Sequence, residues 1–262
     1  MDQLTSKDIE LLIKVFPELY NDLLQSGVRE FGKAIGNGLR FCFLPLSLLG
    51  TLADGINANL QHHLREYKRK LDKIPQDKIV EVPAQLAVPV IQKLSYTTNE
   101  EIANLFTNLL ATASNKNTAD QAHPGFESII SQLSPDEARI IQYLQNLKIV
   151  EYCDLRAYLP EGKGFQVLYE KATMIPARVN LDFPKNIHAY LSNLTRLGII
   201  EDMSGLHNTD NTPYDEIKKA NDFYLYDGLV PTVYKKIDIH KCYFSVTRYG
   251  RMFITACTDK LN

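Results

Sequence analysis

The sequence predicts a mostly helical α+β protein, in which an N-terminal helical bundle is followed by a winged-helix-like domain. Two observations in the last third support this fold class. Within residues 187–201 an amphipathic helix runs into an apolar strand that a glycine introduces. Within residues 243–257 a second strand runs directly into a closing helix. Helix, strand, returning strand and final helix in this order are typical of a winged helix.

Residues 1–132 are predicted to form an all-helical domain. Apolar side chains recur at helical spacing in residues 9–24, and residues 60–74 contain a narrow apolar seam of about two heptads. The clearest helix covers residues 98–113, where Thr98 and Glu101 have the spacing of a capping box and a broad apolar face follows.

Residues 133–262 are predicted to form the winged-helix-like domain. Ser134, Pro135 and Glu137 provide a strong signal for a helix start near the boundary. Helix 184–197 takes the recognition position, and strands 198–202 and 243–247 form the paired wing. The other predicted elements are a first helix at 135–148, a short strand or second element at 152–158, and a closing helix at 248–257. A polar insertion, residues 203–241, separates the wing strands, and a connection of this length usually carries function or structure of its own.

Length and composition are those of a soluble globular protein. A chain of 262 residues can form two domains that each bury a core. The net charge of −2 gives no general attraction to nucleic acid or anionic lipid. Four widely spaced cysteines without a CxxC pair favour free thiols in a reducing cytosol. The N-terminal residues lack the pattern of a secretion signal, so we expect a cytoplasmic location.

One region allows a membrane interpretation. Residues 41–53 are uncharged, but the run is shorter than a bilayer span and is interrupted by Pro45 and Gly50. We expect a core helix here, with interfacial contact at the inner membrane as the alternative. A basic helix face follows the run, and it is either a solvated surface or a contact for anionic lipid or a partner protein. Its residues are Arg65, Lys68, Arg69 and Lys73.

The predicted recognition helix offers a second candidate contact. Its polar residues suited to nucleic acid or a partner protein are Lys185, His188, Asn193 and Arg196. DNA-binding helices usually carry several cations, because phosphate contacts dominate affinity. Residues 133–262 contain 16 basic and 16 acidic side chains. This balance favours protein interaction over DNA binding, which stays the alternative.

The sequence predicts no catalytic, cofactor or metal site. It contains no GK[ST] phosphate loop, no GxSxG and no HExxH motif. His62 and His63 are adjacent on a helix, so they point about 100° apart and do not easily share an ion. His240 and Cys242 lie on one face of a predicted strand, but neither pair has a third ligand at suitable spacing.

Several segments resemble the Abi-alpha (abortive infection alpha) family over roughly residues 32–257. They include KLDKIP, the long stretch PAQLAVPVIQKLSYTTNEEIANLFTNLLATAS, then HPGFESIISQLSPDEARII, LTRLGIIE and the final TRYGRMFITAC. The resemblance implies a bacterial or prophage-encoded protein of phage defence, which sacrifices or arrests the infected cell, and it brings no catalytic motif. We therefore expect a non-enzymatic defence protein that acts through a protein partner or self-association. The alternatives are a DNA-binding regulator and a conditional membrane effector using residues 41–74.

Overall fold

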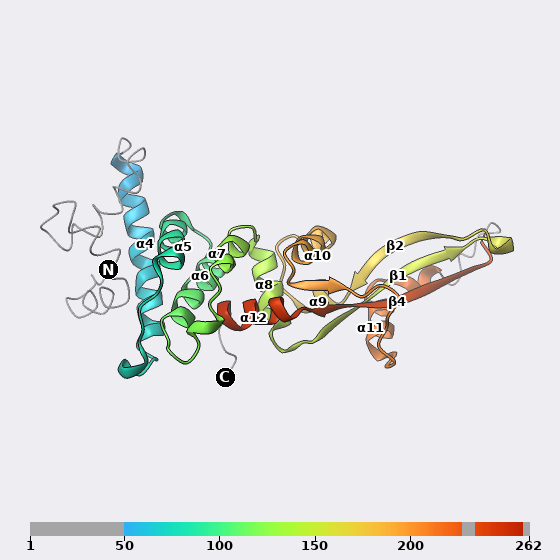
Figure 1. The fold of residues 1–262 in the computed structure, drawn as a ribbon. Helices are drawn as coiled ribbons and strands as arrows, with labels where there is room; N and C mark the ends of the chain where they lie inside the picture. The colour runs from blue at the N-terminus through green and yellow to red at the C-terminus, as the bar shows by residue number, and fades with distance from the viewer. Residues whose placement is uncertain (1–49, 227–233, 259–262) are drawn as a thin grey trace, which may run out of the picture. The chain divides into compact units, whose positions relative to one another are not determined.

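The computed structural model describes residues 50–226 and 234–258 (Figure 1). The predicted helix at 9–24 and residues 41–49 of the apolar run lie outside these ranges. The described chain is α+β, as predicted, and it divides into two compact units. One unit contains residues 50–138 and 252–258, and the other contains residues 139–251. The predicted boundary at 132/133 therefore lies close to the division between the units, but the end of the last helix belongs to the first unit.

The first unit is built from helices around α6 (Glu100–Ala113), which packs against α4 (Gly50–Leu71), α5 (Ala84–Tyr96) and α7 (Gly125–Ile130). The predicted apolar seam is the buried face of α4, and each seam residue within this helix is at most 4% exposed. These side chains are Leu60, Leu64, Tyr67 and Leu71. Burial of this stripe fixes α4 against its neighbours.

The C-terminal half of α12 (Arg248–Cys257) completes the first unit. The side chain of Asn108 donates to the carbonyl of Cys257 at 3.1 Å, and the hydroxyl of Thr112 donates to the carbonyl of Ala256 at 2.8 Å. These bonds satisfy carbonyls at a helix end, which have no partner within the helix. Residues separated by nearly 150 positions are thus joined in one core.

Helix caps agree with the prediction at one site and differ at another. Glu137 accepts from the backbone N–H of Ser134 at 2.7 Å, and the Ser134 hydroxyl accepts from the N–H of Glu137 at 3.3 Å, which is the predicted capping box. At α6 the predicted cap Thr98 is wrong. Asn99 caps this helix, and its side chain accepts from the N–H of Ile102 at 3.1 Å. An Asn at this position is as good a cap as Thr, so spacing alone does not distinguish them.

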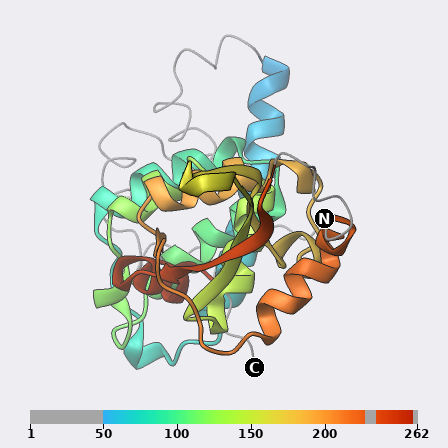
Figure 2. The ribbon, with the colours of Figure 1, turned by 90° about the vertical axis from the view of Figure 1, so that its right-hand side faces the viewer.

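The second unit contains an antiparallel four-stranded sheet in the order β2-β1-β4-β3. Figure 2 shows its strands in colours from yellow-green to red. The strands are β1 (Ile149–Tyr158), β2 (Phe165–Thr173), β3 (Ile200–Asp202) and β4 (Lys236–Val246). The helices nearby are α8 (Pro135–Tyr143, shared between the units), α9 (Ile175–Arg178), α10 (Ile187–Arg196) and α11 (Thr212–Ala220). Short 3-10 turns complete the described chain at Gln76–Lys78, Ala119–Gln121, Leu144–Asn146, Pro160–Gly162, Pro184–Asn186 and Phe223–Tyr226.

The predicted pairing of the wing strands is confirmed, because Ile200 lies opposite Val246 and Asp202 opposite Phe244. The sheet is larger than predicted. β1 is a ten-residue central strand rather than a short element, and β2 was not predicted at all. The segment 203–241 contains α11 and the first half of β4, so it is more than a polar insertion. The winged-helix interpretation itself stays a prediction.

Helix α11 covers the sheet and supplies part of the core of the second unit. Tyr214 and Ile217 of α11 pack with Cys153 and Leu155 of β1, and all four are at most 2% exposed. The hydroxyl of Tyr214 donates to the carbonyl of Cys242 at 3.1 Å. The predicted insertion is therefore needed for the fold. Cys153, Cys242 and Cys257 are free and buried, whereas Cys42 lies outside the described residues.

Candidate functional site

A groove of about 700 Å³ lies between α4 and α6 in the first unit. Helix α4 contributes histidines and both signs of charge, and α6 contributes acidic and amide side chains. The residues that matter below are His62, His63, Glu66, Arg69, Lys73, Glu100 and Asn104. Because α4 packs directly on α6, the two walls of the groove are held by a common core.

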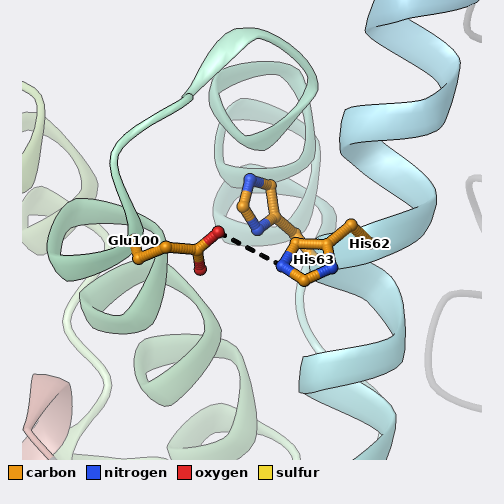
Figure 3. Close-up of side chains that lie close together, drawn as sticks. All are labelled: His62, His63 and Glu100. Carbon is orange, nitrogen blue, oxygen red and sulfur yellow. Dashed lines mark ion pairs between the residues drawn. The ribbon is translucent and has the colours of Figure 1, made fainter.

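Three side chains of types that can bind metal ions lie close together in this groove (Figure 3). Nε2 of His62 lies 3.2 Å from Oε1 of Glu100. His62, His63 and Glu100 each offer one ligand atom, and these atoms lie within 4.8 Å of one another. His62 and Glu100 are open to solvent, with side chains 44% and 68% exposed, whereas His63 is 1% exposed. The cluster therefore spans the edge and the floor of the groove.

The buried ring of His63 is oriented by the turn between α5 and α6. Its Nε2 lies 2.9 Å from the carbonyl oxygen of Thr97, which also accepts from the side chain of Asn59 at 2.5 Å. A carbonyl only accepts hydrogen bonds, so Nε2 of His63 carries the proton and donates it. The other ring nitrogen, Nδ1, then holds a lone pair. Figure 3 shows one ring nitrogen of His63 on the side of the Glu100 carboxylate.

No third ligand was predicted from the sequence, whereas in the structure Glu100 lies beside His62 and His63. The absence of a metal site stays a prediction. The ring nitrogens of the two adjacent histidines come close to one another despite their different Cβ directions, and Glu100 comes from a different helix. A ligand 37 positions away in sequence has no local spacing to reveal it. The second pair considered from the sequence, His240 and Cys242, lies on β4. Cys242 is a buried thiol, and His240 lies opposite Asp154 of β1.

Three residues of the predicted basic face, Arg65, Lys68 and Arg69, lie on α4, and Lys73 lies in the turn that follows. Nearby acidic residues accompany two of these cations. Lys68 pairs with Asp72 at 2.7 Å, and Arg69 pairs with Glu66 at 2.6 Å. Arg65 is half-buried, and Arg69 and Lys73 line the groove. These pairs reduce the net positive field of the face, and its contact with lipid or a partner stays a prediction. Within the described residues, no helix combines the length and apolarity needed to cross a bilayer.

The candidate residues near α10 fall into two pairs. Lys185 and His188 line a pocket of about 320 Å³ together with Tyr169 of β2. Asn193 accepts two hydrogen bonds from the guanidinium of Arg196, at 3.2 and 2.6 Å. Lys185 and Arg196 are both exposed. Contact of these four residues with nucleic acid or a partner stays a prediction.

A surface that the sequence analysis missed lies on β2. This strand is at one edge of the sheet, and its residues Phe165, Val167 and Tyr169 are 46%, 40% and 38% exposed. Phe165 and Val167 lie opposite Tyr158 and Arg156 of β1, so they form an apolar row on one face. Tyr169 lies opposite Leu155 across a register shift, so it belongs to the other face. The guanidinium of Arg156 stacks over the Phe165 ring at 4.3 Å. Leu168 interrupts the alternation of polar and apolar side chains in residues 165–169, so the sequence carried no clear strand signal here.

The fold and these surfaces define a two-unit α+β protein with a polar groove in its helical unit and an apolar edge on its sheet. A family model described as abortive infection alpha matches residues 58–257. The chain belongs to this family, as its sequence resemblance predicted.

No curated protein matches the chain. Among solved structures, the chain is similar to an uncharacterized protein from the hydrocarbon-degrading marine bacterium Alcanivorax borkumensis SK2. The two are 18% identical with a TM-score of 0.33, over 54% of this chain and 94% of the other.

Proposed function

We propose that the protein serves in phage defence by abortive infection, as a non-enzymatic factor that acts through contact with another protein in the cytoplasm. Membership of the abortive infection alpha family over residues 58–257 carries this proposal. In this view the unit of residues 139–251 recognises the partner, and the helical unit passes on the response.

The β2 edge supports contact with a protein chain. In the described sheet β2 pairs only with β1, so the backbone groups on its other side are open to a further strand. Edge strands are usually protected by charges, prolines or β-bulges. Residues 165–169 contain no charge and no proline, and the register shift lies after Val167, so residues 165–167 form the regular part of the edge. An extended segment of a partner could add to this edge, with its backbone giving affinity and the apolar row giving specificity. We take such a segment to be the occupant of the surface.

A phage challenge of expressing cells tests the proposal. Cells with the natural chain should survive as a culture, or release fewer phage, when challenged with at least one of several phages. The variant Val167→Lys should lose this protection, because a charge in the apolar row opposes strand addition. The matched control is Leu206→Lys, which places the same charge on a 51% exposed residue away from β2 and should keep protection.

Three outcomes would count against parts of the proposal. Failure of the natural chain to protect against any phage tested opposes the defence role. Full protection by Val167→Lys removes β2 as the contact surface. Hydrolysis of nucleotides or nucleic acid by the purified protein opposes a non-enzymatic action. Light scattering of natural and Val167→Lys protein separately shows whether the occupant is a second copy of this chain instead of a partner.

A further inference from the structure

We propose that His62, His63 and Glu100 form a binding site for a divalent transition-metal ion, with Zn²⁺ the best match. Imidazole nitrogens and carboxylate oxygens are zinc ligands, and two histidines with one glutamate form a known three-ligand set that leaves a further position open. Mg²⁺ and Ca²⁺ fit less well, because both prefer oxygen ligands alone. The site is distinct from the β2 edge and does not depend on the defence role.

The distances require only small side-chain movements. Zinc bonds of about 2.0–2.2 Å in a tetrahedral site place ligand atoms roughly 3.3–3.6 Å apart. His62 Nε2 and Glu100 Oε1 are already 3.2 Å apart, and all three ligand atoms lie within 4.8 Å. The residues lie on α4 and at the first position of α6, which pack on one another. The backbone therefore holds the ligands near their metal-binding positions.

His63 has the hydrogen bond that metal-binding histidines usually make. In such sites one ring nitrogen binds the ion and the other donates to a carbonyl or carboxylate, which fixes the tautomer. The bond from His63 Nε2 to the Thr97 carbonyl, at 2.9 Å, provides this contact. It leaves Nδ1 as the ligand, and burial of the ring limits other orientations. The chain thus orients one ligand before any ion is bound.

Neighbouring cations are directed to other acceptors. Lys70 donates to the side-chain oxygens of Asn104 at 2.7 Å and Asn108 at 2.5 Å, and Arg69 donates to Glu66 at 2.6 Å. The Glu66 carboxylate offsets the charge of Arg69, and the two amide oxygens hold the Lys70 ammonium at Asn104 and Asn108. The groove of about 700 Å³ leaves space for water or another group at the open position.

A simple ion pair is the competing explanation for part of the cluster. A protonated His62 beside Glu100 would account for their 3.2 Å contact without any metal. It does not account for the third ligand or for the orientation of His63. The two explanations differ in one measurable property, which is affinity for zinc.

The experiment uses the full chain after treatment with a chelator, titrated with Zn²⁺ by calorimetry and with Co²⁺ by visible absorption. We expect one ion per chain and an absorption band typical of nitrogen and oxygen ligands. His62→Ala and Glu100→Gln change exposed side chains, so these variants should fold and should lose at least about 10- to 100-fold in affinity. His207→Ala, an exposed histidine in the other unit, is the matched control and should keep the natural affinity.

His63→Ala removes a buried ring, so its result is interpreted only beside a melting curve of the metal-free protein. Absence of zinc binding by the natural chain would overturn the proposal. Unchanged affinity in both His62→Ala and Glu100→Gln would also overturn it, since the ion would then lie elsewhere. Equal losses in His207→Ala would indicate non-specific binding by surface histidines and would have the same consequence. None of these readouts uses phage, so a failed defence role leaves them unaffected.

Discussion

A β-carbon on Gly250 would lie 2.0 Å from the carbonyl oxygen of Ile199, so the start of α12 touches the backbone that leads into β3. Thr247 holds the same junction. Its hydroxyl donates to the carbonyl of Gly198 at 2.5 Å and accepts from the N–H of Gly250 at 2.7 Å. The glycine is needed for close approach of two backbone segments, because no side chain fits between them.

Gly250→Ala should therefore destabilise the protein by about 3 kcal/mol, the upper range for overpacking a rigid core. The sign is informative, because helix propensity alone would make the alanine variant more stable by about 1 kcal/mol. Urea unfolding of both proteins measures the difference. Arg248→Ala, on an exposed residue of the same helix, should change stability by less than about 0.5 kcal/mol. A stabilised Gly250→Ala protein would contradict the contact with Ile199.

Asn99→Ala should cost about 1 kcal/mol, because the N–H of Ile102 loses its side-chain acceptor at the start of α6. Thr98→Ala provides a direct comparison, since sequence spacing predicts Thr98 as the cap and the structure assigns Asn99. Thr98 is exposed, and its replacement should have little effect. Thermal melts of the two variants decide between them. A larger loss in Thr98→Ala would show that the predicted cap is the functioning one.

The elements that could be predicted from sequence are those with strong local patterns. Ser134 and Glu137 form the expected capping box. The pairing of Ile200 with Val246 could be predicted because each strand directly adjoins a helix with a clear sequence pattern. β2 escaped prediction because it is an edge strand with exposed residues on both faces, so it lacks a regular alternation of polar and apolar side chains.

The candidate sites were less predictable, for a different physical reason. The basic residues of α4 could be placed on one helix, but their partners Asp72 and Glu66 could be identified only as possible neighbours. Glu100 joins His62 and His63 through the packing of α4 on α6, a long-range contact that no local spacing reports. Sequence patterns thus identified the residues on each element, and tertiary packing determined which of them meet.

Arg251→Lys should destabilise the unit of residues 139–251 by about 1.5–3 kcal/mol. The Arg251 guanidinium donates to the carbonyls of Gln145, at 2.7 Å, and Leu147, which follow α8. A lysine ammonium keeps the charge but cannot reproduce the planar fork of donors. Arg196→Lys, on an exposed residue of α10, is the matched control, and its change in unfolding free energy should stay below about 0.5 kcal/mol. If Arg251→Lys lowered the unfolding free energy no more than Arg196→Lys, the positive charge of residue 251 would be sufficient and its fork of donors would not be needed.

Stability should fall on acidification because of His240. Burial, together with the positive charge of Arg156, holds the pKa of His240 below its ordinary value, although Asp154 partly opposes the shift. The unfolded chain, with a histidine pKa of about 6.5, then binds more protons than the folded one. The contribution of His240 to stability is present above about pH 6.5 and is lost as the pH falls from there through the folded-state pKa.

His240→Gln should flatten the pH dependence of the unfolding free energy, measured by urea at a series of pH values below about 6.5. Arg156→Gln should flatten it in part, because removal of the positive neighbour raises the pKa of His240 toward its unfolded value. An unchanged slope in His240→Gln would assign the acid sensitivity to other groups.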